Sequence, residues 1–419
     1  MKPIVKFLLI SILGWASLSK GRAAQNFDLE QMDFYLHTVE VGDLVFNNFG
    51  HTALRVHDRL NQRNFILNWG IFDFGEPLDF SLRFYSGDLG YRLGVARLST
   101  TLKRYQLEQR TVWEDKFNLN PIQKKILWDR IVWNLKPENR GYQYQYFFDN
   151  CSTRIRDYID EALGGELKTL TKTRPTNETF RDMVRSHYAT NPEISFFLEL
   201  IMNGRLEGQM SVWQKMFLPI SLRHYLLEYV NADGQPILIP GKVLYEFPKP
   251  KPYALTGFQL YALLLSIVLA LALGLGLLKG SASSRPAYKL WGTFVVFHGF
   301  WMGLLGVVLP LNWVFSGHLD LAHNANIAFF WPLDFLFVVL GVKWIMKGGP
   351  LLLPTRAFRV LKGYLLTHLI GLPLFSICYA LGIIHQDVSL ILTYMMPFSL
   401  ILFLGALGFG VKEKSGARP

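Results

Sequence analysis

The sequence is poor in cysteine and in charged residues for its length. Only 2 of its 419 residues are cysteine, and 18% are charged, against about 25% in an average soluble domain. Half of the residues are hydrophobic and 15% are aromatic. This composition excludes an intrinsically disordered chain and argues against a purely soluble protein. Two cysteines are also too few for a disulfide-stapled fold.

Acidic residues are missing from the first 22 positions, which hold 4 Lys or Arg. Lys2 and Lys6 lead into an apolar run over residues 7–19. A run of that length is typical of a secretory signal, whereas a helix that spans a bilayer needs about 20 residues. Small residues follow, interrupted by Lys20 and Arg22. We therefore predict a signal peptide over residues 1–24, either cleaved or retained as an anchor.

The formal net charge of +11 comes from the two ends of the chain. Residues 23–254 hold 28 basic and 28 acidic residues, so this middle part is neutral. Binding to a phosphate backbone requires a basic stripe on the folded domain. We therefore expect no nucleic-acid partner.

Long hydrophobic runs are concentrated after residue 253. Five stretches have roughly the length of a membrane span: 254–278, 290–310, 327–346, 363–384 and 388–411. Lys and Arg lie between the first and second stretches, at or between the third and fourth, and after the fifth. The other two connections, 311–326 and 385–387, contain neither. By the positive-inside rule the basic loops are cytoplasmic, which predicts a multi-pass protein of the bacterial inner membrane.

The same rule places the residues before the first span on the periplasmic face. Residues 25–247 alternate short apolar runs with Gly, Pro, Asn and Asp, at a length typical of one α+β domain. Residues 248–253 are rich in Pro and Lys and predict a stiff linker. An all-α membrane domain over 254–411 and a cytoplasmic tail over 412–419 complete the predicted organisation.

Cys151 is the only cysteine of the predicted periplasmic domain, because Cys378 falls in the fourth span. Such a thiol is either a buried small hydrophobe or a reactive group. Asn150 is a good N-cap, and the apolar residues after Cys151 recur at helical spacing. Cys151 is thus predicted in the first turn of a helix, where the dipole favours the thiolate. Arg154 adds positive charge one turn later.

A thiolate needs a base, and His51 follows Gly50 at the start of a predicted strand. A second strand, residues 64–74, follows a polar turn. A hairpin centred between positions 59 and 60 pairs His51 with Asn68, within about 5.5 Å. An Asn beside a catalytic His completes a Cys-His-Asn arrangement. A register shifted by two or three residues makes Asp73 the partner instead, and Asn68 is equally explained as a strand-end amide.

Three motifs in this order resemble the Lnb-type bacterial lipoprotein N-acyltransferases: GHTALR at 50–55, NWGIFDF at 68–74 and NCSTRIRD at 150–157. The order of His, polar partner and Asn-Cys is also similar to that of lecithin:retinol acyltransferase and its relatives. The resemblance implies an α+β, circularly permuted papain-like domain followed by five transmembrane helices. It implies Cys151 as nucleophile, His51 as base and Asn68 as the orienting residue.

The resemblance also implies the substrates. An acyl chain would pass from a membrane phospholipid, through a thioester on the cysteine, to the α-amine of the diacylglyceryl-cysteine of an apolipoprotein. The alternative is a papain-like cell-wall amidase or peptidase anchored in the membrane, although such an enzyme has no need for five spans.

The predicted outer loop 311–326 carries a group of polar residues. It is either an interfacial polar loop or a surface that meets the head group of a substrate. The candidate substrate-binding residues are Arg154, His318, His323, Asn324 and Asn326. The two histidines of the loop do not have a standard zinc spacing, and the chain has no glycine-rich phosphate loop. We therefore expect neither a metal nor a cofactor.

Overall fold

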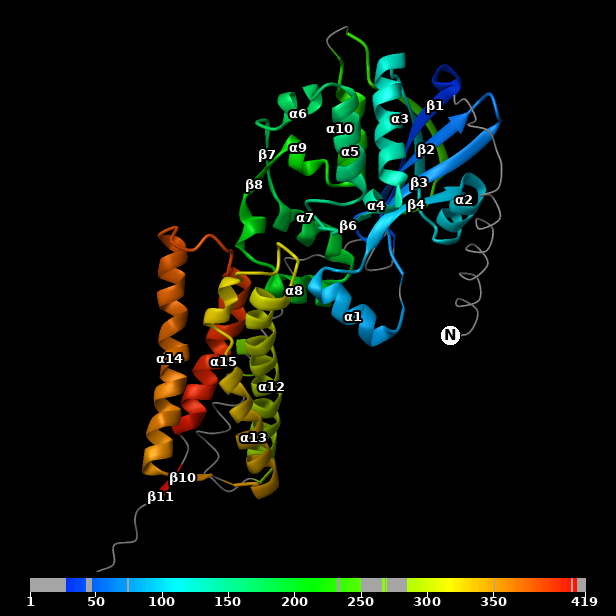
Figure 1. The fold of residues 1–419 in the computed structure, drawn as a ribbon. Helices are drawn as coiled ribbons and strands as arrows, with labels where there is room; N and C mark the ends of the chain where they lie inside the picture. The colour runs from blue at the N-terminus through cyan, green and yellow to red at the C-terminus, as the bar shows by residue number, and fades with distance from the viewer. Residues whose placement is uncertain are drawn as a thin grey trace, which may run out of the picture.

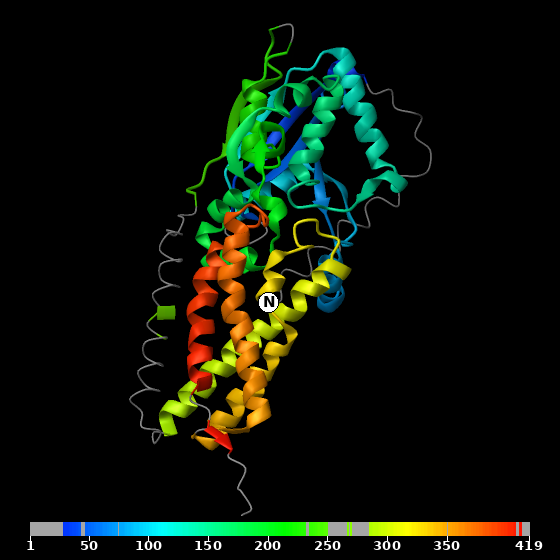
Figure 2. The ribbon, with the colours of Figure 1, turned by 90° about the vertical axis from the view of Figure 1, so that its left-hand side faces the viewer.

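The computed structural model describes residues 28–42, 47–73, 75–231, 234–249, 266–267, 269, 285–349, 351–407 and 410–412. A mixed α+β domain lies above a bundle of helices (Figure 1). Figure 2, turned by 90°, shows the same arrangement, so the two parts are stacked end to end. The predicted signal peptide, nearly all of the first predicted span and most of the predicted tail lie outside the described residues.

A seven-stranded antiparallel sheet forms the frame of the α+β domain, in the order β6-β4-β3-β2-β1-β5-β9. The strands are β1 (Met32–Val39), β2 (His51–Asp58), β3 (Arg63–Ile71), β4 (Tyr91–Arg97), β5 (Val112–Phe117), β6 (Gly141–Tyr142) and β9 (Leu238–Tyr245). In β1 the apolar residues Met32, Phe34 and Leu36 alternate onto the face of the main buried cluster, and most of the other residues of this strand are buried as well.

The β2–β3 hairpin has its centre one residue later than the sequence predicts. Leu54 faces Leu67, so the turn comprises residues 59–62. The reason is Asp58, whose carboxylate accepts hydrogen bonds from the backbone and side-chain amides of Asn61. A local Asx turn of this kind ends the strand directly at the aspartate.

A shift of one residue at the turn moves every cross-strand partner by two. The predicted register pairs Leu54 with Phe65, whereas in the structure Leu54 pairs with Leu67, the last pair of this ladder toward His51. The predicted register is therefore wrong. Asn68, one residue beyond the last pair, still reaches His51 through its side chain.

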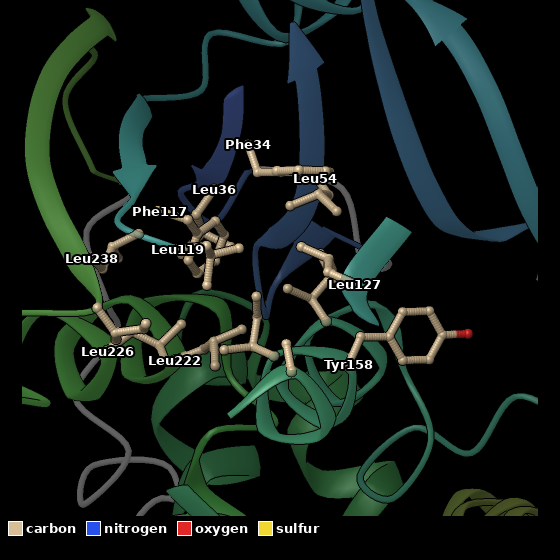
Figure 3. Close-up of a cluster of buried hydrophobic side chains, with 14 of the residues drawn as sticks. Phe34, Leu36, Leu54, Phe117, Leu119, Leu127, Tyr158, Leu222, Leu226 and Leu238 are labelled. Carbon is tan, nitrogen blue, oxygen red and sulfur yellow. The ribbon is translucent and has the colours of Figure 1, made fainter. Parts of the chain in front are cut away.

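Helices cover both faces of the sheet. The helices of the α+β domain are α1 (Pro77–Ser86), α2 (Leu98–Leu107), α3 (Pro121–Leu135), α4 (Pro137–Arg140), α5 (Cys151–Ala162), α6 (Glu166–Thr171), α7 (Phe180–His187), α8 (Pro192–Ile201), α9 (Val212–Lys215) and α10 (Pro219–Glu228). The largest buried cluster joins strand residues such as Leu54 to α3, α5 and α10 (Figure 3). A smaller cluster packs α2 on the opposite face through Tyr105.

The lower part of the domain is an aromatic cluster rather than a sheet. Phe147, Phe180 and Phe217 lie within 5.3 to 5.5 Å of one another, ring centre to ring centre. They connect the segment before α5 with α7 and with the start of α10. Beside them is the short antiparallel pair β7 (Pro175–Thr179) and β8 (Gln209–Ser211).

Two helices among the described residues are long and apolar enough to cross a membrane, over Tyr288–Phe315 and Thr355–Ala380. The helices of the bundle are α12 (Arg285–Phe315), α13 (Phe335–Lys347), α14 (Thr355–Ala380) and α15 (Ser389–Leu407), and the parallel pair β10 (Leu352–Pro354) and β11 (Gly410–Lys412) lies at their lower end. The predicted spans 290–310 and 363–384 fall on α12 and α14. The last predicted span falls on α15, whose apolar stretch is shorter.

The third predicted span, 327–346, is not one continuous helix. Its helical part, α13, begins only at Phe335 and has 13 residues. The 3₁₀ turns Ala325–Ala328 and Pro332–Asp334 precede it. Asp334 explains the late start, because its carboxylate accepts hydrogen bonds from the Trp331 backbone and from the Tyr364 hydroxyl of α14.

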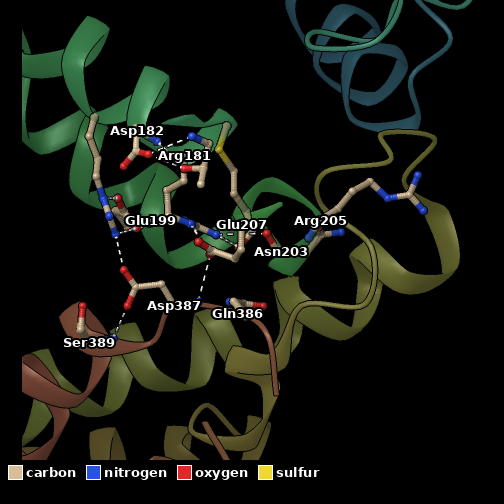
Figure 4. Close-up of polar contacts among 12 residues, drawn as sticks. Arg181, Asp182, Glu199, Asn203, Arg205, Glu207, Gln386, Asp387 and Ser389 are labelled. Carbon is tan, nitrogen blue, oxygen red and sulfur yellow. Dashed lines mark hydrogen bonds and ion pairs between the residues drawn. The ribbon is translucent and has the colours of Figure 1, made fainter. Parts of the chain in front are cut away.

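Polar contacts hold the α+β domain to the outer ends of the bundle (Figure 4). Arg185 of α7 donates to Asp387 in the loop before α15, at 2.7 Å. Glu207 accepts a hydrogen bond from the Asp387 backbone and another from Arg181. The α+β domain is therefore fixed to the membrane part by charged groups from both.

Candidate active site

Cys151 is the first residue of α5, and Asn150 is its N-cap. The Asn150 side-chain oxygen accepts from the backbone N–H groups of Ser152 and Thr153, at 2.8 and 2.9 Å. Its amide nitrogen donates to two backbone carbonyls, one of them that of Phe217. Because the side chain is buried and fully bonded, it fixes the start of α5 and leaves the Cys151 N–H outside the cap.

The Cys151 thiol is 8% exposed and lies among hydrogen-bond donors. Burial raises the pKa of the thiol, but its interaction with His51, by charge and by hydrogen bond, lowers it. The backbone N–H of Thr52 and the Ser152 side chain lower the pKa further, and the net result lies below the ordinary value for cysteine. The thiolate therefore forms more readily than it does in a free cysteine, in spite of the burial of Cys151.

His51 is held by Asn68, with Nε2 of the imidazole 3.0 Å from Oδ1 of the amide. An amide oxygen only accepts hydrogen bonds, so Nε2 carries the ring proton. Nδ1 is then the nitrogen left to meet the Cys151 thiol. The structure brings together the three residues that the sequence singles out, in the order of a Cys-His-Asn arrangement.

The other two candidates near the site are paired elsewhere. Both carboxylate oxygens of Asp73 bond to Arg92, at 2.8 and 3.0 Å, in an exposed ion pair. The guanidinium of Arg154 bonds to both oxygens of Asp149 and lies over the ring of Tyr142. Asp73 is thus paired with Arg92 and not with His51. Arg154, one helical turn after Cys151, is held in place by Asp149.

A pocket with aromatic walls opens at Cys151. Its empty space is about 310 Å³, counting the part open to solvent. The residues that line it are Phe49, Gly50, Tyr144, Tyr146, Asn150, Cys151, Phe217 and Pro219. Gly50 has a φ of +79°, and a Cβ there would lie 2.6 Å from the Val39 carbonyl oxygen. Only glycine therefore allows the chain to turn into His51 beside the pocket.

Two asparagines of the predicted outer loop lie at the junction of the two parts of the chain. Asn324 and Asn326 are fully buried, and both donate to the Leu200 carbonyl at the end of α8. Asn324 also accepts a hydrogen bond from Gln386 in the loop before α15. Their amide nitrogens are bonded to the chain itself, so both side chains hold the loop against α8, and contact with a head group stays a prediction.

The two histidines of this loop are nearer the surface. Nε2 of His318 donates to the Phe84 carbonyl at the end of α1, at 2.7 Å. The ring of His323 packs against Trp313 of α12, with centroids 5.1 Å apart. Contact of these side chains with a lipid head group stays a prediction.

Reasoning from the sequence missed four residues around the thiol. Thr52 and Ser152 contact it, and their hydroxyls are 2.7 Å from each other. Tyr144 and Tyr146 form a wall of the pocket. The sequence did contain a feature that could have identified the two tyrosines, because Tyr and Gln alternate just before the cysteine motif.

Within the described ranges, no group of three or more His, Cys, Asp or Glu is arranged to hold a metal ion. Residues 20–186 match the family model described as the Lnb N-terminal periplasmic domain. No curated protein and no solved structure matches the chain. The matched range contains all three motifs that carry the resemblance, which is thereby confirmed. Residues 20–186 are thus similar to the Lnb N-terminal periplasmic domain family, and the chain is a membrane protein with a periplasmic domain.

Proposed function

We propose that the protein is a lipoprotein N-acyltransferase of the bacterial inner membrane. The observation that carries the proposal is the Cys151 thiol at the start of α5, in a pocket with aromatic walls, with its pKa lowered by a His51 that Asn68 orients. The donor is a membrane phospholipid and the acceptor is the α-amine of a diacylated apolipoprotein. The finer architecture belongs to the same proposal: a permuted papain-like domain on the periplasmic face and five membrane spans.

The first half-reaction forms a thioester. Nδ1 of His51 takes the thiol proton, and the thiolate attacks an ester carbonyl of the phospholipid. The tetrahedral oxyanion collapses, the C–O bond breaks, and the protonated imidazole returns its proton to the leaving lysophospholipid oxygen. The acyl chain remains on Cys151.

The second half-reaction transfers the acyl chain to nitrogen. The free amine of the apolipoprotein attacks the thioester while His51 accepts one of its protons. The C–S bond breaks, and the thiolate leaves and regains a proton from the imidazolium. A thioester suits this step because amines attack it readily, whereas an ester resists them.

The backbone at the start of α5 is suited to hold both oxyanions. The Cys151 N–H is one of the helical donors that the Asn150 cap does not use. One such donor is worth about 3 to 4 kcal/mol of transition-state stabilisation, by analogy with oxyanion-hole deletions. The positive end of the helix dipole adds to the effect.

The test is intact-mass spectrometry of the protein purified from membranes, because a fatty-acyl adduct is expected for the transferase and not for an amidase or peptidase. The adduct should map to Cys151, disappear with hydroxylamine and be missing from Cys151→Ala. Cys378→Ala serves as the matched control and should keep it. In a strain deficient in N-acylation, wild type should restore triacylated lipoproteins and Cys151→Ala should not. Full restoration by Cys151→Ala would refute the proposal.

A further inference from the structure

The helix α1 presents an apolar face that nothing in the described parts of the chain covers. Leu78 and Leu82, one turn apart, form this face and are 73% and 61% exposed. Phe84 is half exposed and lies on another side of the helix, next to Phe80. Its charged residues Asp79 and Arg83 form an ion pair with each other on another side. A short helix with one apolar face and one charged face is typical of a segment lying in a membrane interface.

The position of α1 fits that reading. Its C-terminal end touches the chain just after α12, where Gly317 donates to the Ser86 carbonyl at 2.9 Å. A Cβ on Gly87 would lie 3.2 Å from the Gly317 backbone, so the two segments are in close contact. Figures 1 and 2 both place α1 beside the outer end of α12.

The end of α12 is itself apolar and exposed. Trp313, Val314 and Phe315 close the span candidate Tyr288–Phe315 and are all exposed. The exposed face of α1 therefore continues the lipid-facing surface of a membrane helix at the level where that helix leaves the bilayer. Continuity with that surface identifies the occupant as lipid rather than a second protein.

A line of aromatic rings runs from α1 to the catalytic pocket. Each ring centroid lies 4.6 to 6.5 Å from the next, and the last two rings line the pocket at Cys151. The rings are those of Phe84, Phe80, Phe72, Tyr91, Tyr144 and Tyr146. One end of this line is exposed beside a membrane helix, and the other end borders the thiol.

We propose that α1 is an interfacial helix, inserted in the outer leaflet through Leu78 and Leu82, and that the phospholipid acyl donor reaches Cys151 past this helix and along the aromatic line. The route of the acyl donor rests on the proposed acyl transfer, whereas the insertion of α1 in the leaflet does not. A membrane-inserted α1 would draw a lipid chain toward an apolar path without first exposing the chain to water.

The insertion is tested without any catalysis. Full-length protein with Cys151→Ala and Cys378→Ala receives a single nitroxide at Leu82→Cys, or at Leu60→Cys as the matched control. Both leucines are 61% exposed, but Leu60 lies in the β2–β3 turn at the far end of the sheet. In vesicles of phosphatidylethanolamine and phosphatidylglycerol, position 82 should be accessible to oxygen and protected from a nickel chelate. Equal accessibility of both positions to the chelate would overturn the proposal.

The route is tested by comparing two acyl donors on otherwise wild-type protein. Leu82→Gln should slow thioester formation from vesicle phospholipid about tenfold or more, and leave the rate with p-nitrophenyl butyrate within twofold. Leu60→Gln should change neither rate. An unchanged phospholipid rate in Leu82→Gln would overturn the route. If wild type forms no thioester from phospholipid, the proposed function and the route fail together, while the nitroxide contrast still decides insertion.

Discussion

Asn68 holds the ring of His51 by a single hydrogen bond of 3.0 Å, from Nε2 to Oδ1, and that bond decides which nitrogen faces Cys151. Without it the imidazole could flip, or its proton could move to the other nitrogen. In either case the lone pair would no longer point at the thiol. The amide thus acts on catalysis through His51 alone.

Asn68→Ala should therefore cost less than His51→Ala. Losing one orienting hydrogen bond of about 1 to 1.5 kcal/mol corresponds to roughly a tenfold loss of rate. Removing the general base costs about 10²- to 10⁴-fold. The measurement is the rate of acyl-enzyme formation on Cys151 for each variant.

Asp73→Asn is the control for this series, because Asp73 is exposed and bonded to Arg92. It should leave the rate within twofold. A larger loss in Asp73→Asn than in Asn68→Ala would transfer the orienting role to the aspartate.

The reactivity of Cys151 should depend on pH in a way that identifies His51 as its partner. The pKa of the thiol is raised by burial but lowered on balance by His51, Thr52 and Ser152. Alkylation by iodoacetamide should therefore reach half of its maximum rate at a lower pH than it does with a free cysteine.

His51→Ala removes the two largest contributions that lower the pKa of the thiol and leaves burial, which raises it, so the midpoint should lie at a higher pH than in wild type. The pH–rate profiles are measured in a Cys378→Ala background, which leaves Cys151 as the single thiol. The assignment of His51 is contradicted if the profile is the same with and without the imidazole.

Replacing Asn150 should lower both the stability of the fold and the rate of thioester formation, whereas loss of an ordinary N-cap should lower stability alone. Asn150→Ala removes the cap of α5 and the two hydrogen bonds to backbone carbonyls. The loss of a cap alone costs about 1 to 2 kcal/mol of unfolding free energy. The start of α5 carries the nucleophile, so its displacement should also reduce thioester formation.

Asn120→Ala offers a matched comparison. Asn120 caps α3 with the same kind of capping box, but it does not line the pocket at Cys151. Both variants should lower the melting temperature, and only Asn150→Ala should lower the rate. Equal rates in the two variants would show that the cap does not position Cys151.

The sequence was enough to predict which residues form the candidate site, but not the strand register that brings them together. The Asn150 cap, the helix after Cys151 and the hairpin are local features, determined by residues close in the chain. The register depended on whether Asp58 ends its strand, and a one-residue difference there moved the partner of Leu54 from Phe65 to Leu67. The predicted contact between His51 and Asn68 is made all the same, through their side chains beyond the paired part of the strands.

Features that depend on distant segments were not predictable. Hydropathy alone suggested a continuous span over 327–346, whereas the hydrogen bond from Tyr364 to Asp334 belongs to another helix. Asn324 and Asn326 read as loop polar groups, but they meet the end of α8, more than a hundred residues earlier. No spacing in the sequence contains that information.

A buried ion cluster on the sheet should make stability depend on acid pH. Glu114 of β5 accepts from His37 at 2.8 Å and from Arg55 at 2.6 Å. Burial raises the pKa of Glu114, but the hydrogen bonds from His37 and Arg55 outweigh it and hold the pKa at about 2.

Because the folded-state pKa is below the unfolded value of about 4.3, ionised Glu114 stabilises the fold above that value. This stabilisation, on the order of 3 kcal/mol, is lost as the pH falls from about 4.3 toward 2. Glu114→Gln should therefore be less stable than wild type at pH 6, and the difference should narrow by pH 3. Thermal unfolding of the full chain in detergent at both pH values measures this, with the exposed Glu138→Gln as control. A difference that stays constant between the two pH values would mean that Glu114 is not ionised in the fold.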